Sequence, residues 1–213
     1  MRLSDFTALI AQMPTRYQSF TAKRVTQNWL NILHREDRAG AAMCQLFGEQ
    51  ESVELSRSDL RVFARQESLD CFVMATLLWG YPDGMRKTWA SDISDNLLAL
   101  TSLLNEARQG IANWRPHFAR ADAIRGLGLS TYTKFLNFLS ADVSGHPALI
   151  LDKRIIDVAA AGVFGEFEGS YSEENYPAYL KRMHSIATDL RVEAENLEFF
   201  LYEFGINLKN PVQ

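Results

Sequence analysis

Cysteine is scarce in this chain of 213 residues, which contains only Cys44 and Cys71. Two cysteines cannot form a disulfide framework, a four-cysteine zinc site or a four-cysteine iron–sulfur cluster. The four histidines lack metal-ligand spacing, and the sequence has no Gly-rich nucleotide-binding loop. We therefore expect a protein of the cytoplasm that works without a metal or cofactor.

Long hydrophobic runs are also missing. No apolar run approaches the roughly 20 residues of a membrane span, and the N-terminal segment lacks the pattern of a signal peptide, so no membrane partner is expected. Hydrophobic residues still make up 47% of the chain, which indicates a folded globular protein. The net charge of −4 counts against tight, non-specific binding to nucleic acid. Basic residues nevertheless gather at Arg115, His117, Arg120 and Arg125, either to hold phosphates or as an ordinary solvated face.

Nearly every segment has helical periodicity, and no alternating run is long enough to predict a sheet, so the expected fold class is all-α. Helices are predicted over residues 4–13, 21–35, 58–66, 68–80, 93–110, 114–123, 155–164, 174–190 and 193–204. The segment 39–56, interrupted by Gly40 and Gly48, is predicted to be an irregular connection. The helix over 68–80 is apolar enough to be buried at the centre, and a tight turn is expected at 81–84.

The stretch 123–156 combines a glycine hairpin, a lysine and an aspartate. Ile124 to Gly128, followed by Phe135 and Leu136, matches the helix-hairpin-helix pattern, although Tyr132 stands where a small residue is expected. In that motif the glycines allow a tight turn, so amides at a helix N-terminus face a DNA phosphate. An ordinary turn between helices is the alternative. The residues predicted to contact DNA are Arg125, Gly126, Gly128, Ser130 and Thr131.

The chain resembles the helix-hairpin-helix DNA glycosylases, and most closely a bacterial group with the 8-oxoguanine DNA glycosylase fold. The resemblance rests on four passages, at 75–86, 126–138, 147–155 and 175–205. It implies a single domain over 1–213 with two helical lobes around a cleft, one over about 1–110 and a hairpin-containing catalytic lobe over about 111–213. It also implies that the partner is double-stranded DNA carrying a modified base, such as an 8-oxoguanine-like purine.

The resemblance assigns chemistry to a lysine and an aspartate. In lyase-competent glycosylases the lysine amine attacks C1′ of an extruded nucleotide, and the resulting Schiff base leads to strand cleavage, while the aspartate stabilises positive charge. Carried over, Lys134 is the nucleophile and Asp152 its partner, 152 − 134 = 18 positions apart. The amine must be neutral part of the time, and burial favours its neutral form.

One conflict concerns the place of the lysine. Aligned on the glycines alone, the family lysine falls on Ser130, one helical turn (about 6 Å) before Lys134 on nearly the same face. The Thr-Lys-Phe-Leu block at 133–136 fits the bacterial group, so we favour Lys134. The alternatives are a solvent-facing lysine on an amphipathic helix and an aspartate that only caps a helix.

Aromatic residues near the predicted turn are further candidates. Trp79 and Tyr81 are predicted to stack on the flipped base or to wedge the duplex, with ordinary core packing as the alternative for Trp79. Phe138 and His146 are candidates for the base pocket, with packing as the alternative for Phe138. A solvated helix face near the C-terminus is expected for the acidic residues Glu193, Glu195 and Glu198.

Two functional hypotheses follow. The first is a bifunctional DNA glycosylase/lyase acting on an oxidised or modified purine. The second is a catalytically inactive DNA-binding module of the same fold, for example in a phage-defence or DNA-modification system; the acidic charge balance, Tyr132 and the displaced lysine favour it. A third option is an all-α protein unrelated to DNA, and the surface potential around Ser130, Lys134 and Asp152 separates it from the others.

Overall fold

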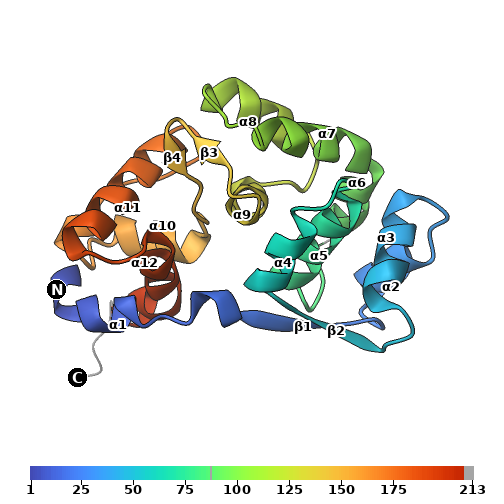
Figure 1. Ribbon diagram of the computed structural model, residues 1–213, viewed down its shortest axis with the longest axis horizontal. Helices are drawn as coiled ribbons and strands as arrows, with labels where there is room; N and C mark the ends of the chain where they lie inside the picture. The colour runs from blue at the N-terminus through green and yellow to red at the C-terminus, as the bar shows by residue number, and fades with distance from the viewer. Residues whose placement is uncertain (87, 209–213) are drawn as a thin grey trace.

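The computed structural model describes residues 1–86 and 88–208; Lys87 and residues 209–213 lie outside the described range. Most of the described chain is helical (Figure 1), which confirms the all-α fold class. The α-helices are α1 (Thr7–Ala11), α2 (Gln27–Leu33), α3 (Arg38–Phe47), α4 (Arg57–Phe63), α5 (Asp70–Gly80), α6 (Trp89–Asp95), α7 (Leu97–Ala107), α8 (Trp114–Asp122), α9 (Leu129–Phe138), α10 (Lys153–Ala160), α11 (Tyr176–Leu190), α12 (Ala194–Phe200) and α13 (Ile206–Leu208). Shorter 3-10 turns are η1 (Leu3–Phe6), η2 (Thr15–Tyr17) and η3 (Gly165–Phe167), and η4 (Leu201–Gly205) is a π-helical turn.

Within the described residues, no helix combines the length and apolarity needed to cross a membrane, and a cytoplasmic location stays a prediction.

Two small antiparallel sheets of two strands each interrupt the helical pattern, contrary to the expectation that no sheet would form. Strand β1 (Ser19–Lys23) pairs with β2 (Ser52–Ser56), and β3 (Asp142–Val143) pairs with β4 (His146–Pro147). The helix predicted over 21–35 was therefore wrong at its start, and the segment 39–56 is not irregular but contains α3 and β2. Five residues of β1 are too few for a visible alternation, and β2 pairs with them from about 30 positions away along the chain.

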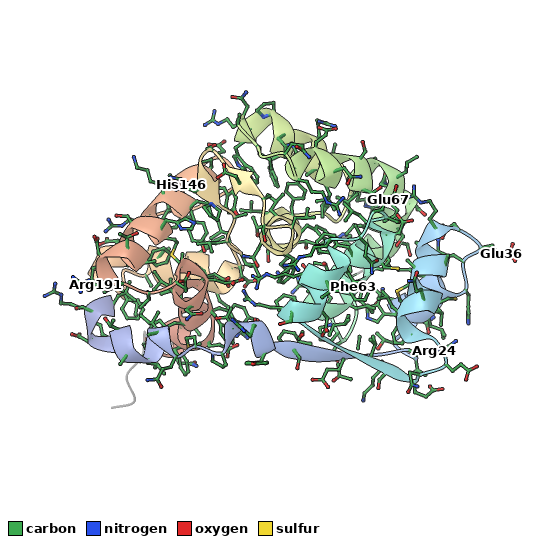
Figure 2. The ribbon with its side chains drawn as sticks, in the orientation of Figure 1. Arg24, Glu36, Phe63, Glu67, His146 and Arg191 are labelled. Carbon is green, nitrogen blue, oxygen red and sulfur yellow. The ribbon has the colours of Figure 1, made fainter. Side chains whose placement is uncertain are left out.

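Helix α5 is the buried centre of the molecule, as its apolar sequence predicts. Every residue from Cys71 to Trp79 is buried, and α3, α4, α7, α9, β1 and β2 all pack against it. The Phe72 and Phe135 rings meet edge to face at 5.8 Å, which locks α9 onto α5. Charged side chains such as Glu36 and Glu67 stay at the periphery (Figure 2). The C-terminal end of α5 and the length of α9 are thus held in a fixed relation.

The N-terminal segment lies beside the C-terminal helices (Figure 1). Helix α1 and η2 pack against α12, and the Phe6 ring lies 5.3 Å from that of Phe200. The chain therefore passes η2 and β1 on its way from the C-terminal helices to the elements around α5. The division into lobes near residue 110 stays a prediction.

The acidic run near the C-terminus is only partly solvated. Glu193 is exposed, but Glu198 is 1% exposed and forms an ion pair with Arg57. The expectation of a solvated face was therefore wrong for Glu198. Its partner lies 141 positions earlier in the chain, beyond the reach of any local pattern.

Candidate active site

The glycine hairpin lies between α8 and α9. Gly126 has a φ of +87°, and a Cβ on it would lie 2.7 Å from the Cβ of Trp89, so both conformation and space require glycine. Gly128 has an ordinary φ of −80° and forms the N-cap of α9 without a side-chain bond. Among the described residues other than its two chain neighbours, no heavy atom lies within 4 Å of a Cβ placed there. The turn is tight at Gly126 and open at Gly128, where a groove of about 310 Å³ borders the N-terminus of α9.

The side chains around the hairpin divide into exposed and buried ones. The Arg125 side chain is 71% exposed and lies 3.5 Å from Asp92. Tyr132, at the position where a small residue is expected, is fully buried and hydrogen-bonds His117 through its hydroxyl. Burial raises the pKa of Tyr132 well above its ordinary value, so its phenol stays neutral. The Tyr132 side chain, which departs from the motif, therefore fills the space between α8 and α9 and leaves the glycine hairpin intact.

Lys134 lies on α9, and its side chain is 9% exposed, which excludes the alternative of a solvent-facing lysine. Its methylene stem passes the C-terminal end of α5, where a Cβ on Gly80 would lie 3.4 Å from Lys134 Cδ. The Nζ amine donates to Ser130 Oγ at 2.7 Å and to the Ser130 carbonyl at 3.2 Å. It lies 3.5 Å from Asp152 Oδ2. The lysine and aspartate that are 18 positions apart in sequence therefore meet in space.

Asp152 has two roles at the start of α10. Its Oδ1 accepts the amide of Arg154 at 3.1 Å and so caps the helix. Its Oδ2 accepts the hydroxyl of Ser130 at 2.9 Å. Burial alone would raise the pKa of Asp152, but the Lys134 ammonium and the two hydrogen bonds lower it below its ordinary value. The carboxylate is therefore ionised at neutral pH.

Ser130 joins these two groups. Its hydroxyl accepts from Lys134 and donates to Asp152, so it lies inside the ion pair, whereas the sequence analysis assigned it to DNA contacts. Ser130 is also the position onto which the family lysine aligns through the glycines. Because the Lys134 side chain runs back along α9 by one turn, its amine reaches the Ser130 side chain. The Lys134 amine therefore lies beside the side chain of position 130 and beside Asp152.

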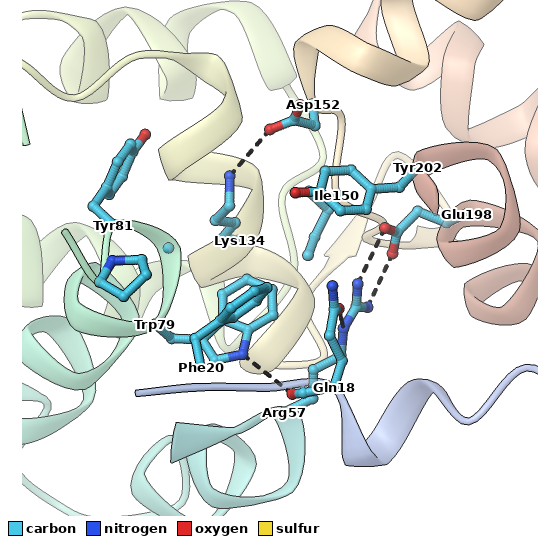
Figure 3. Close-up of a pocket in the computed structure, with 12 residues that line it drawn as sticks. Gln18, Phe20, Arg57, Trp79, Tyr81, Lys134, Ile150, Asp152, Glu198 and Tyr202 are labelled. Atoms are coloured by element: carbon cyan, nitrogen blue, oxygen red, sulfur yellow. Dashed lines mark hydrogen bonds and ion pairs between the residues drawn. The ribbon is translucent and has the colours of Figure 1, made fainter. Parts of the chain in front are cut away.

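A cavity of about 210 Å³ opens on this pair (Figure 3). Its walls come from the N-terminal segment, the start of α4, the end of α5, α9, the approach to α10, α12 and η4. The lining residues are Gln18, Phe20, Arg57, Trp79, Gly80, Tyr81, Pro82, Lys134, Ile150, Asp152, Glu198 and Tyr202. Lys134 and Asp152 thus face a partly open space whose lining includes the aromatic side chains of Phe20, Trp79, Tyr81 and Tyr202.

A second ion pair, which the sequence analysis missed, lines the same cavity. Arg57 and Glu198 are each 1% exposed, and two guanidinium nitrogens of Arg57 contact the two carboxylate oxygens at 3.1 and 3.2 Å. Arg57 also contacts Glu195 at 3.3 Å, and its guanidinium lies 5.6 Å from the centre of the Trp79 ring. Burial disfavours its charge, but the two carboxylates raise the pKa of Arg57 above its ordinary value. Arg57 begins α4 after a capping box, and nothing local in the sequence indicates its distant partner.

The comparison with known families bears on this arrangement. The family described as "Putative 8-oxoguanine DNA glycosylase OGG-like protein" matches residues 15–202. The chain belongs to this family. Searches among curated proteins and among solved structures give no significant match. Membership confirms the resemblance to the glycosylases and supports a DNA glycosylase-like function with DNA as the partner.

Two of the predicted aromatic residues of this OGG-like chain reach the cavity. Trp79 is 4% exposed, and its indole donates to the Gln18 carbonyl at 3.3 Å, so it combines core packing with a place in the wall. Tyr81 lines both the cavity and the groove at the hairpin. Its hydroxyl lies 2.6 Å from the hydroxyl of the buried Thr131, which joins the end of α5 to the start of α9. The Thr131 hydroxyl is thus used inside the protein.

The other two predicted pocket residues do not line this cavity. Phe138 is buried and meets Trp79 edge to face at 5.1 Å, and it is not among the residues that line the cavity. His146 lies on β4 toward the outside of the molecule (Figure 2) and stacks on His184 at 5.6 Å. Over residues 1–86 and 88–208, no group of three His, Cys, Asp or Glu side chains is placed to hold a metal ion.

Proposed function

We propose that this chain is a bifunctional DNA glycosylase and AP lyase that removes an oxidised or otherwise modified purine, such as 8-oxoguanine, through a Schiff base on Lys134. The observation that carries the proposal is the position of the Lys134 amine in the cavity wall, 2.7 Å from Ser130 Oγ and 3.5 Å from Asp152 Oδ2. Family membership supports DNA glycosylase-like chemistry. A cavity whose lining includes four aromatic side chains suits a base that has left the stack.

The chemistry divides between the two charged groups. The amine gives up a proton and attacks C1′ of the extruded nucleotide, while the bond from C1′ to the base breaks and the base leaves with the electron pair and takes up a proton. Because the pKa of Asp152 is lowered, its carboxylate is a weak proton acceptor and acts mainly by stabilising the positive charge that develops on the sugar. Opening of the sugar ring then gives the Schiff base, and loss of a proton from C2′ to solvent with departure of the phosphate from C3′ cleaves the strand.

The hairpin supplies the DNA contact in this proposal. The groove beside Gly128 borders the N-terminus of the ten-residue helix α9, where backbone amides and the helix dipole favour an anion. The exposed Arg125 lies in the same turn. A phosphate held there would lie at the end of the helix that carries Lys134. The hairpin thereby sets the register of the duplex and the cavity receives the extruded nucleotide.

Borohydride trapping tests the proposal. Purified protein is mixed with duplexes that carry 8-oxoguanine, another modified purine or an abasic site, and covalent adducts are resolved on a denaturing gel. We expect an adduct with wild-type protein and a loss on the order of 10³-fold or more in Lys134→Gln, because that change removes the nucleophile. Lys153→Gln is the matched control, since Lys153 is exposed and pairs with Asp157 at 2.8 Å.

The outcomes separate the two hypotheses. An adduct that survives Lys134→Gln would assign the nucleophile to another amine. The absence of an adduct on every duplex, with DNA binding intact, would instead favour the catalytically inactive DNA-binding module.

A further inference from the structure

The floor of the cavity carries a polar group that the proposed chemistry does not use. Gln18 is half-buried and follows η2, where the chain enters β1. Its side chain lines the cavity beside Arg57 (Figure 3), on the floor below the wall that holds Lys134. A primary amide presents an acceptor at one end and a donor at the other, so its orientation decides what it can bind.

Arg57 decides that orientation. The Nε–H of Arg57 donates to Gln18 Oε1 at 2.8 Å, and because a guanidinium has no acceptor, the amide oxygen must face it. The guanidinium is itself held by Glu198 at 3.1 and 3.2 Å and by Glu195. The amide nitrogen of Gln18 is left on the cavity side, and no hydrogen bond to it occurs within residues 1–86 and 88–208.

The backbone of Gln18 is held by the same neighbours. Its carbonyl accepts the Arg57 amide at 3.1 Å and the Trp79 indole at 3.3 Å. Main chain and side chain are therefore both fixed before any ligand binds. A donor held in this way loses little conformational entropy on binding, which makes it a selective contact.

We propose that Gln18 reads the extruded base by donating its amide N–H to a carbonyl oxygen on the base edge, so that the site selects oxo-bases. Arg57 and Glu198 are positioning residues in this arrangement, because they act through Gln18. An amino group at the same edge would place two donors face to face and leave both without an acceptor, which weakens binding about tenfold or more. The inference rests on the proposed function only in taking the cavity as the base site.

Gln18→Glu reverses the polarity of the contact at nearly constant shape. One carboxylate oxygen keeps the bond from Arg57, and the other presents an acceptor to the cavity where Gln18 presents a donor. In a Lys134→Gln background, which prevents turnover, the Kd is measured by fluorescence anisotropy for three duplexes carrying 8-oxoguanine, adenine or a tetrahydrofuran abasic analogue opposite cytosine. Each comparison is between two proteins on one duplex, so the energy of opening the base pair cancels.

We expect Gln18→Glu to weaken binding of the 8-oxoguanine duplex at least about tenfold. Binding of the abasic duplex should stay unchanged, and that of the adenine duplex should not weaken. Gln12→Glu, the same change at an exposed position of the N-terminal segment, is the control and should alter none of the three.

Two results would overturn the inference. An unchanged Kd for the 8-oxoguanine duplex would mean that Gln18 does not contact the base. Equal weakening on all three duplexes would mean that Gln18 supports the structure and does not read a base. Because these measurements need no covalent chemistry, failure of the lyase proposal in the trapping experiment is distinguishable from failure of this one.

Discussion

Two ion pairs line one cavity, and they are built differently. Arg57 and Glu198 are each 1% exposed and meet through two contacts, at 3.1 and 3.2 Å. Lys134 and Asp152 are 9% and 23% exposed and meet through a single contact of 3.5 Å, with a hydroxyl between them. The first pair has the bidentate geometry that makes a buried pair rigid. The second, loose pair leaves its amine facing the cavity, where the proposed reaction needs it.

The two ion pairs also differ in the kind of cation that each contains. A guanidinium stays protonated at any pH that a protein experiences, so Arg57 is a permanent charge around which a cavity floor can be organised. An ammonium can lose its proton, and Lys134 is the cation placed where the proposed reaction needs a free electron pair. The positively charged residues of the cavity are thus not interchangeable, and each can be tested by changing its carboxylate partner.

The largest effect is expected when the rigid pair is broken. Glu198→Ala leaves the Arg57 guanidinium buried without its bidentate partner, and we expect it to lower the free energy of unfolding by about 3–5 kcal/mol. For a domain of this size the melting temperature should fall by roughly 6–20 °C. Circular dichroism during thermal and urea unfolding measures both quantities.

Two controls accompany this change. Glu193→Ala, on an exposed residue just before the same helix, should change stability by no more than about 0.5 kcal/mol. The double change of Arg57→Met with Glu198→Leu should recover most of the loss, because neither charge is then left unpaired. A cost for Glu198→Ala no larger than that of Glu193→Ala would contradict a structural role for the pair.

A smaller effect, mainly on the reaction rate, is expected when the loose pair is changed. Asp152→Asn keeps a good N-cap for α10 but removes the charge, so the protein should fold normally. We expect adduct formation on an abasic duplex to slow on the order of 10²-fold, because the developing positive charge loses its carboxylate. Asp157→Asn, on the same helix with a side chain 41% exposed, is the matched control. A normal rate in Asp152→Asn would confine Asp152 to capping.

The pH dependence of the melting temperature gives a second test of the charge on Asp152. The folded-state pKa of Asp152 is lowered, so its ionisation contributes stability that is present above the ordinary value of 3.8 and is lost as the pH falls through the lowered pKa. Melting temperatures of wild type and Asp152→Asn should therefore differ most near neutral pH and converge in acid. A difference in melting temperature between the two proteins that stays constant from neutral pH down into acid would show that the charge of Asp152 is not coupled to folding.

The two pairs also differ in how far the sequence predicts them. Gly126, Gly128, Lys134 and Asp152 sit within one continuous stretch whose turn and cap signals are local, so their proximity could be expected from spacing and resemblance. Arg57 and Glu198 are 141 positions apart, and each stands in a segment that reads locally as an ordinary polar helix face. Only tertiary packing brings them together, and the same holds for the pairing of β1 with β2 and for the orientation of Gln18.

The smallest effect concerns the hydroxyl inside the loose pair. Ser130→Ala removes a group that accepts from Lys134 at 2.7 Å and donates to Asp152 at 2.9 Å, while the start of α9 stays intact. We expect adduct formation to slow about tenfold, the value of one hydrogen bond, with little change in melting temperature. Ser140→Ala, just after the other end of α9, should leave the rate unchanged. An unaltered rate in Ser130→Ala would mean that Asp152 alone positions the amine. A loss as large as that of Lys134→Gln would show that position 130, where the family lysine aligns, carries more of the chemistry than a bridging hydroxyl.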